Sequence, residues 1–267
     1  MGKNTVHKAM QRLVAVQYRR TVTSGHSQPC LIEAETAEGE RWEVVMKLRG
    51  SISGVERGLA RELVASLLAS RLGLSVPAPC LVDVTREFAE SIQMQDVRSR
   101  MRSNLGCQFG TTQLSGSWHA VPFSGNLPDR LFDTAASVFA FDALLRNDDR
   151  HLEKANYLMS GNTVMLIDHE RAFPTPGMAS GPMPWENGGL SFLTRHVFFA
   201  GLKGQLPDFT NLLDAFEIIP SADFGEIAAM IPNEWDTGTV AAEVEGYLVA
   251  LSKNFRKFRT ALETIIR

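Results

Sequence analysis

The sequence predicts an α+β protein with two lobes, and two observations support this prediction. Strand-like runs separated by turn residues fill the first part of the chain, whereas apolar residues at helical spacing fill its end, as in 239–266. A stretch rich in Gly, Ser and Thr at 107–126 lies between these two parts. We therefore expect a β-rich lobe over residues 1–107 and a helical lobe over residues 108–267.

Three strands are predicted at the start of the first lobe. Turn residues between positions 24 and 29 divide the segment 17–36 into the two strands of a hairpin. A second turn at 37–40 leads into the sequence "RWEVVMKL" at 41–48, whose alternation is typical of a third strand.

A helix and further strands complete the predicted first lobe. Leucines at helical spacing predict a helix over residues 55–74, and Gly73 is placed to stop it. The segments 79–85 and 90–95 are expected to add strands, because both contain β-favouring apolar residues bounded by polar ones.

The second lobe is predicted to contain a helix, a hairpin and a long loop. Apolar spacing indicates a helix over 127–147, with Pro128 suited to its first turn. Two short apolar runs at 155–159 and 163–167 flank a Ser-Gly-Asn turn and predict a hairpin. The stretch 173–189 is too rich in Pro and Gly for regular structure, and loops of this length usually have a function, here substrate contact.

Composition and charge narrow the class of protein. The chain has 267 residues, 44% hydrophobic and 21% charged, as in ordinary soluble globular proteins. A net charge of −3 gives no overall attraction to nucleic acid or an anionic membrane. Three scattered cysteines without a CxxC pair argue against a disulfide framework or a zinc site. With neither a signal peptide nor an apolar stretch of membrane-spanning length, we expect a cytoplasmic protein.

The predicted hairpin is the first candidate functional feature. Asn156 enters its first strand and Asp168 leaves its second, so the fold should bring their side chains together. A carboxylate and an amide oxygen offer two ligands to Mg²⁺, which completes its shell with phosphate and water. The alternative is that each residue simply serves a turn or a cap.

A second candidate precedes the hairpin. Asp149 follows a predicted helix, and an acid near a helix C-terminus is disfavoured by the helix dipole, so another role is expected there. Accepting a hydroxyl proton would be such a role. Arg150 could hold the geometry of this acid or neutralise phosphate charge. Asp148 competes with Asp149 as the catalytic acid.

These residues carry a resemblance to a known family. "NDDRHLEKANYL" at 147–158, followed by "VMLIDHERAF" at 164–173, resembles the catalytic segment of HipA-like kinases. It is also similar to lipid kinases of the phosphoinositide type. Asn156 lies seven residues after Asp149, whereas protein kinases have five, so two residues are inserted. The resemblance implies a two-lobed protein kinase-like fold that uses ATP and Mg²⁺.

A kinase also needs a lysine and a glutamate in the first part of the chain, and both are present. Lys47 ends the third predicted strand in the form Val-x-x-Lys, where it would bind the phosphates of ATP. Glu62 falls on the apolar stripe of the predicted helix. A carboxylate facing the core needs a cationic partner, and Lys47 is the expected one.

Other nucleotide contacts are implied by position alone. A turn that joins the first two strands would cradle phosphates through its backbone N–H groups, from Gly25, His26, Ser27 and Gln28. The backbone of Gln108 and Gly110 lies at the predicted lobe junction, where the resemblance puts adenine.

The resemblance also suggests what the enzyme would act on. It implies transfer of the γ-phosphoryl group to a protein Ser or Thr, a toxin-type kinase, and an antitoxin or other regulatory partner. Ser51 and Ser53 are candidates for self-modification. The basic run 253–259 is expected to be a solvated helix face, so neither nucleic acid nor a membrane is an expected partner. The alternatives are a pseudokinase scaffold, which binds nucleotide without transferring phosphate, and a metal-dependent hydrolase that needs neither Lys47 nor Glu62.

Overall fold

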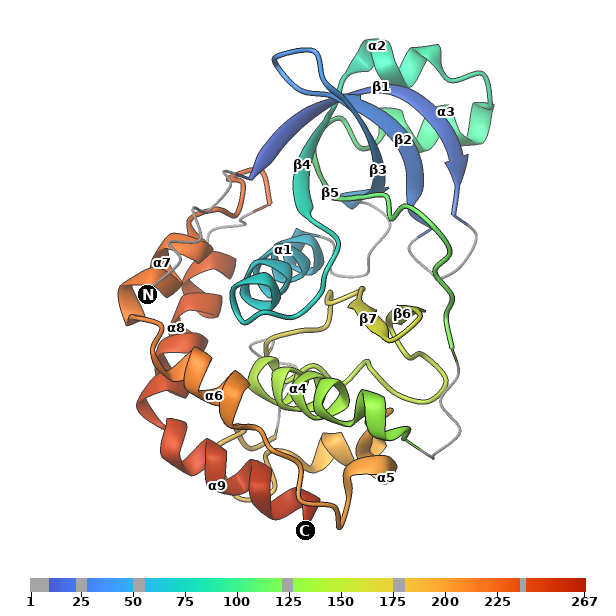
Figure 1. Ribbon diagram of the computed structural model, residues 1–267. Helices are drawn as coiled ribbons and strands as arrows, with labels where there is room; N and C mark the ends of the chain where they lie inside the picture. The colour runs from blue at the N-terminus through green and yellow to red at the C-terminus, as the bar shows by residue number, and fades with distance from the viewer. Residues whose placement is uncertain (1–9, 23–27, 50–55, 122–126, 175–180, 236–238) are drawn as a thin grey trace. The chain divides into compact units, whose positions relative to one another are not determined.

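A computed structural model describes residues 10–22, 28–49, 56–121, 127–174, 181–235 and 239–267 (Figure 1). The chain divides into two compact units, each built from two segments. The first unit contains residues up to 59 and residues 77–115, and the second contains residues 60–76 and 116–267. The boundary that the sequence predicts, at 107/108, differs from this division, because residues 108–112 complete a strand of the first unit and residues 60–76 pack within the second.

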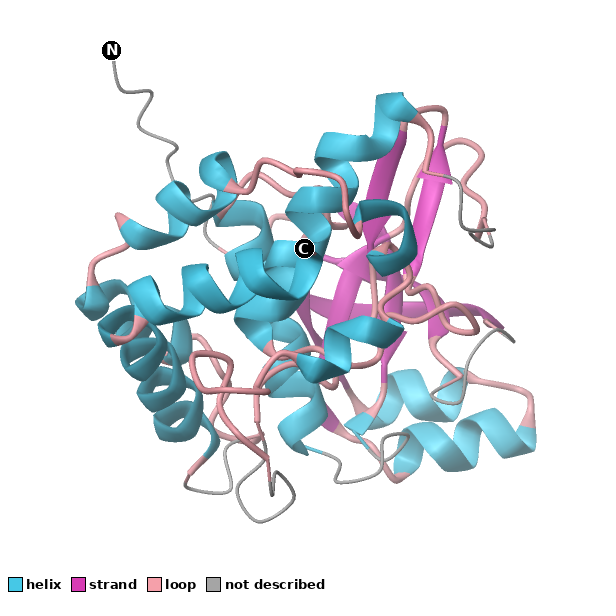
Figure 2. Ribbon diagram, turned by 90° about the horizontal axis from the view of Figure 1, so that it is seen from below, coloured by secondary structure: helices cyan, strands magenta, loops and turns pink. Residues whose placement is uncertain are grey.

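The first unit is a closed five-stranded barrel with the strand order β1-β2-β3-β5-β4. β1 pairs in parallel with β4, and the other neighbours are antiparallel. The sequence predicts a β-rich first part but not this closure. The strands of the barrel lie together in Figure 2. Their bounds are β1 (Gln11–Thr21), β2 (Cys30–Glu35), β3 (Arg41–Lys47), β4 (Pro79–Val84) and β5 (Gly106–Thr112).

The barrel interior is filled by alternate side chains, as period-two strands require. In β2, for example, Cys30, Ile32 and Ala34 are fully buried while the residues between them are half-buried. A side chain at Gly110 would not fit, because its Cβ would lie 2.6 Å from Cγ1 of Val44. Only glycine can occupy that position of the barrel without displacing its neighbours.

Two short helices connect β4 to β5, so the strand expected at 90–95 is wrong. α2 (Arg86–Ser91) begins where the Thr85 hydroxyl accepts the Phe88 N–H at 3.1 Å. α3 (Gln95–Arg102) buries Val97 and Met101, one turn apart, against the same core cluster as the barrel. Local capping and helical spacing outweigh the β propensity of the two apolar residues in 90–95.

The second unit is mainly helical and includes most of α1 (Glu56–Arg71), which confirms the helix predicted over 55–74. Gly73 has a φ of +79°, and Leu74 N–H donates to Ala69 O at 2.9 Å, so the helix ends in a Schellman motif. α4 (Asp129–Leu145) confirms the helix predicted over 127–147. The hairpin of β6 (Tyr157–Ser160) and β7 (Thr163–Leu166) is also confirmed.

The rest of the second unit covers α4. Phe139 of α4 lies 6.4 Å from Phe199 and 6.3 Å from Phe209, both with nearly parallel rings. Figure 1 shows α7 beside α8, and these two helices pack against each other. The bounds are η2 (Ser191–Arg195), α5 (Phe199–Leu202), α6 (Thr210–Glu217), α7 (Ser221–Ala228), α8 (Val240–Lys253) and α9 (Phe255–Ile266).

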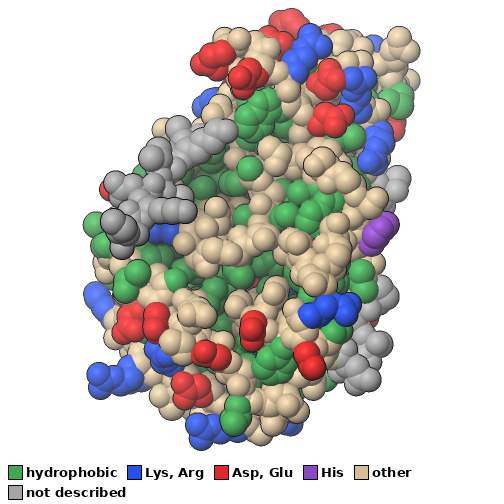
Figure 3. Space-filling view, viewed as in Figure 1, with side chains coloured by type: hydrophobic (Ala, Val, Ile, Leu, Met, Phe, Trp, Pro, Cys, Tyr) green, Lys and Arg blue, Asp and Glu red, His purple; other side chains and the backbone are tan. Residues whose placement is uncertain are grey.

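The charge distribution on the surface is consistent with the small net charge of the sequence. On the face shown in Figure 3, acidic and basic side chains are interspersed on the part of the chain that the structure describes. Among the same residues, no helix is both long and apolar enough to cross a bilayer.

Candidate functional site

The β6–β7 hairpin brings together Asn156 and Asp168, as the sequence predicts. The two residues flank its strands, and Ile167 N–H donates to the Asn156 carbonyl at 3.1 Å. Both have left-handed backbone conformations, with φ of +49° for Asn156 and +60° for Asp168. Such conformations are disfavoured for residues with a side chain, and Asn and Asp tolerate them better than most. Strained residues often cluster at functional sites, which favours a role beyond turn formation.

Asp149 belongs to the same group of side chains. The Asn156 amide donates to both the carbonyl and the Oδ2 of Asp149, each at 3.1 Å. Lys154 places its Nζ 2.5 Å from Asp149 Oδ2 and 3.3 Å from Asp168 Oδ2. The Lys154 ammonium therefore lies between two predicted site carboxylates, and Asn156 joins them through its hydrogen bonds to Asp149.

Lys154 is a site residue that the sequence analysis does not identify. Burial alone would lower the pKa of its ammonium, but the hydrogen bond to Asp149 and the charge of Asp168 raise the pKa above its ordinary value. The sequence does contain a signal for its role, since Lys154 lies between Asp149 and Asn156 in the motif at 147–158. The direction of its side chain cannot be read from the sequence, because it depends on the local turn at 151–154.

Asp148 and Asp149 have different surroundings. Asp148 forms an ion pair with Arg171, with N–O distances of 3.0 and 3.3 Å, and its side chain is 35% exposed. The side chain of Asp149 is 12% exposed and faces Lys154 and Asn156. This geometry favours Asp149 over Asp148 as the acid of the site.

Arg150 is completely buried. This burial distinguishes its two expected roles, holding the geometry of Asp149 and neutralising phosphate charge. Its Nε donates to Asp142 Oδ2 at 2.6 Å, and its Nη1 donates to the carbonyl of Asn156. Its side chain has no exposed area, so in this conformation it cannot contact a phosphate. Arg150 instead ties the segment after Asp149 to α4, which supports the role of holding geometry.

Asp142 is a buried counter-charge that the sequence analysis does not identify. Besides Arg150, it accepts hydrogen bonds from Asn147 Nδ2 at 2.8 Å and from His196 Nε2 at 2.9 Å. Burial would raise the pKa of its carboxyl, but the charge of Arg150 and the His196 hydrogen bond hold that pKa well below its usual range. Asp142 is therefore a buried anion whose partners come from two segments of the second unit, residues 147–150 and His196.

The hydrogen bonds of His196 define its tautomer. Its Nδ1 accepts the Phe198 N–H at 3.1 Å, so the proton of the neutral ring must be on Nε2, which faces Asp142. Protonating Nδ1 would break the bond to Phe198. Burial lowers the pKa of His196 below its ordinary value, although the hydrogen bond to Asp142 opposes this effect.

This environment predicts how stability depends on pH. Below about pH 6.5, the ordinary histidine pKa, the unfolded chain binds a proton that the folded His196 does not. The free energy of unfolding should then fall by up to about 1.4 kcal/mol per pH unit until the lowered pKa is reached. Urea denaturation of His196→Gln should show a shallower pH slope than wild type, whereas the exposed His119→Gln should not. Equal slopes for His196→Gln and wild type would contradict this assignment.

Glu62 is held beside the segment that follows Asp168. Its Oε2 accepts the His169 N–H at 2.6 Å, and its side chain is only 4% exposed. The His169 ring is buried with its plane nearly perpendicular to that of Phe141, at a centroid distance of 6.0 Å. Glu62 therefore positions the backbone next to Asp168, and its predicted pairing with Lys47 stays a prediction.

The structure shows the surroundings of four residues of the first unit that the sequence predicts to bind the nucleotide. Lys47 is the last residue of β3, as predicted. Gln108 is fully buried, where its Oε1 accepts the Arg49 N–H at 2.8 Å, and Gly110 is paired with both β3 and β4. These contacts give Gln108 and Gly110 packing roles, and adenine binding by them stays a prediction. Gln28 has a φ of +40°. Five other predicted residues lie outside the described ranges: Gly25, His26, Ser27, Ser51 and Ser53.

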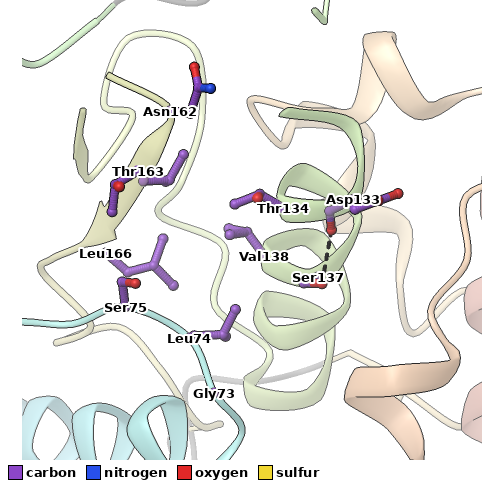
Figure 4. A pocket seen from close by; sticks show the side chains of 11 residues that line it. Gly73, Leu74, Ser75, Asp133, Thr134, Ser137, Val138, Asn162, Thr163 and Leu166 are labelled. Carbon is purple, nitrogen blue, oxygen red and sulfur yellow. Dashed lines mark hydrogen bonds between the residues drawn. The ribbon is translucent and has the colours of Figure 1, made fainter. Parts of the chain in front are cut away.

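A cavity of about 320 Å³ in the second unit contains none of the candidate site residues (Figure 4). It lies between α4, the β6–β7 turn and the linker after α1. Leu74, Val138 and Leu166 point into it, and hydroxyl groups such as that of Thr134 border it. The cavity is thus separate from the group formed by Asp149, Asn156 and Asp168.

Comparisons with known proteins identify the family of the chain. The sequence model of the family described as "HipA-like kinase" matches residues 16–261. The chain belongs to the HipA-like kinase family. No curated protein matches it significantly.

Solved structures extend the comparison to the fold of this HipA-like kinase. The crystal structure of the Helicobacter pylori proinflammatory kinase CtkA matches with a TM-score of 0.55 and 13% identity, covering 97% of this chain and 100% of that one. The open conformation of CtTel1 has a TM-score of 0.32 and 13% identity, covering 91% of this chain and 12% of that one, which is too low to inform the fold. The likeness to CtkA supports a kinase-like fold of mixed strands and helices.

Proposed function

We propose that this HipA-like kinase transfers the γ-phosphoryl group of ATP to a Ser or Thr hydroxyl of a protein, with Mg²⁺ as cofactor. The observation that carries the proposal is that Lys154 pairs with both Asp149 and Asp168, while the Asn156 amide donates to Asp149. In the reaction, the hydroxyl oxygen bonds to the γ-phosphorus, the bond to the β-phosphate oxygen breaks, and ADP leaves.

The residues present fit a magnesium ion. No group of three His, Cys, Asp or Glu side chains among the described residues could form an all-protein metal site. Mg²⁺ does not require one, since it usually binds one or two protein oxygens and fills its shell with phosphate and water. The Asp168 carboxylate and the Asn156 amide oxygen would hold it. When bound, Mg²⁺ would neutralise charge on the transferring phosphoryl group.

Asp149 and Lys154 have complementary roles in the proposal. Asp149 would orient the acceptor hydroxyl and accept its proton, which suits a mostly buried carboxylate that faces the site. Lys154 would supply positive charge beside Asp149 and Asp168 as negative charge builds up on the phosphoryl oxygens. Arg150 would act only through the backbone, by fixing the segment that connects Asp149 to Asn156.

ATP would be bound by the residues that the sequence predicts for this role, all of them in the first unit except Glu62. Lys47, at the end of β3, would bind the α- and β-phosphates, and Glu62 would orient Lys47. The turn containing Gly25, His26, Ser27 and Gln28 would cradle phosphate oxygens, and the backbone at Gln108 and Gly110 would meet adenine. On the family resemblance alone, we also propose a toxin-type role in the cytoplasm and an antitoxin or other regulatory protein as partner.

The experiment is transfer of label from [γ-³²P]ATP to protein in the presence of Mg²⁺. Wild type should transfer label, and EDTA should stop the transfer. Asp149→Asn should lower the rate by about 10²- to 10⁴-fold, the usual contribution of a general base. Asp148→Asn is the matched control, and it should change the rate by only a few fold because this partly exposed acid pairs with Arg171.

The two alternative functions predict different results in this experiment. A pseudokinase scaffold would bind ATP without transferring label. A metal-dependent hydrolase would cleave another ester at a rate that Lys47→Ala leaves unchanged, whereas the kinase should lose most of its transfer in that variant. Equal rates for Asp149→Asn and Asp148→Asn would contradict the proposed role of Asp149.

A further inference from the structure

The segment between Asp149 and Asn156, which is two residues longer than in protein kinases, contains a tight turn. His151 N–H donates to Lys154 O at 3.1 Å, and Lys154 N–H donates to His151 O at 3.0 Å. This reciprocal pair closes a four-residue hairpin turn whose central residues are Leu152 and Glu153. The longer spacing of this segment thus includes a turn with a defined backbone geometry.

The base of this turn is fixed on both sides. His151 forms a second bridge with His196, next to the hydrogen bond from Val197 N–H to Arg150 O at 3.0 Å. On the other side, the Lys154 side chain bonds to Asp149 and Asp168. A tip on such a base is held at a defined position beside the proposed catalytic acid.

The side chains at the tip face solvent. Leu152 is 55% exposed, although leucine is a large apolar residue, and the Glu153 side chain is 84% exposed. His151 Nδ1 lies 2.8 Å from Glu153 Oε2, which limits the directions the carboxylate can take. A backbone hydrogen bond and the His151 contact lower the pKa of Glu153, so it is ionised at neutral pH. The tip thus presents one apolar and one anionic group to solvent.

We propose that Leu152 and Glu153 dock the substrate segment that carries the acceptor hydroxyl, and that they select segments with an apolar and a basic residue near the Ser or Thr. The inference rests on the proposed phosphotransfer to protein. An apolar side chain on the acceptor would bury the exposed face of Leu152, and an Arg or Lys would pair with Glu153. Because Leu152 and Glu153 are only three and four residues from Asp149, a bound segment would bring its hydroxyl to this acid.

A peptide library with one central Ser or Thr tests the inference. The full-length protein would phosphorylate it with Mg²⁺ and labelled ATP, and each flanking position would be scanned. Wild type should prefer Arg or Lys at one position and an aliphatic residue at another. Glu153→Lys should reverse the first preference toward Asp or Glu, and Leu152→Ser should remove the second. On the best wild-type peptide, each variant should lose about tenfold in kcat/KM, mostly through a higher KM.

Matched controls and separate readouts make the outcomes distinct. Glu217→Lys and Leu206→Ser change an exposed glutamate and a 94% exposed leucine on other loops and helices, and both should keep the wild-type preferences. Unchanged preferences in Glu153→Lys and Leu152→Ser would overturn the docking role while phosphotransfer stands. Label transfer to the chain itself but to no peptide would also overturn docking alone. If wild type labels neither itself nor any peptide, the proposed function fails as well.

Discussion

Replacing Asp142 with Asn is expected to lower the free energy of unfolding by about 3–5 kcal/mol, because it leaves a buried guanidinium without a counter-charge. Arg150 has no exposed side-chain area, and its Nε lies 2.6 Å from Asp142 Oδ2. The other acceptors of Arg150 are the backbone carbonyls of Ala155 and Asn156, which carry no net charge. The variant would also weaken the hydrogen bond from His196. Urea denaturation followed by circular dichroism would measure the loss.

Two further variants distinguish the cost of an unpaired buried charge from the cost of losing an ordinary surface ion pair. Asp214→Asn removes the acid that lies 3.0 Å from Arg259, where both side chains are partly exposed, and should cost less than about 1 kcal/mol. The double variant Asp142→Leu with Arg150→Met replaces the buried charges by apolar groups and should recover part of the stability, because Asn147 and His196 still lose their acceptor. If Asp142→Asn were no more costly than Asp214→Asn, Asp142 would not be the required counter-charge of Arg150.

The double variant also tests what the ion pair is for. If it folds stably but transfers phosphate slowly, the buried pair serves geometry more than stability. Arg150 reaches the carbonyl of Asn156, so without it the backbone that carries the proposed metal ligand loses an anchor. Asn156 has a φ of +49°, a conformation that its surroundings must maintain.

The sequence is sufficient to predict those parts of the site that depend only on residues close together in the chain. The hairpin at 155–168 and the helix at 127–147 are predictable because turn residues and apolar spacing act within a few positions. These elements alone bring Asn156 and Asp168 together. The motif resemblance then identifies Asp149, whose contact with the Asn156 amide is also within a short segment.

Features that depend on distant partners cannot be predicted in this way. Asp142 and His196 are 54 residues apart in the chain, and no local pattern connects them. The Gly and Thr residues of β5 are typical of a linker by composition, whereas pairing with β3 and β4 makes this segment a buried strand. Barrel closure likewise requires the parallel contact between β1 and β4, which two separate strand predictions do not contain.

Asp168→Asn is expected to lower the rate of phosphotransfer by at least about 10³-fold. A metal ion supplies several kcal/mol of charge stabilisation in the transition state, and a neutral amide would hold it far less strongly than a carboxylate. The substitution also removes one of the two carboxylates beside Lys154. Asn is the informative replacement because it keeps the side-chain shape and tolerates the left-handed backbone, with φ of +60°, better than Ala does.

The measurement combines label transfer with a titration of Mg²⁺. The variant should need a much higher Mg²⁺ concentration for any residual transfer, while its thermal unfolding should stay close to that of wild type. Asp133→Asn is the matched control, since Asp133 lies on α4 at the cavity and away from Lys154, and its rate should stay within about twofold of wild type. Because Asp149 and Asn156 remain in place in the variant, wild-type activity of a folded Asp168→Asn protein would mean that Asp168 does not hold the metal, and the proposed magnesium site would be wrong.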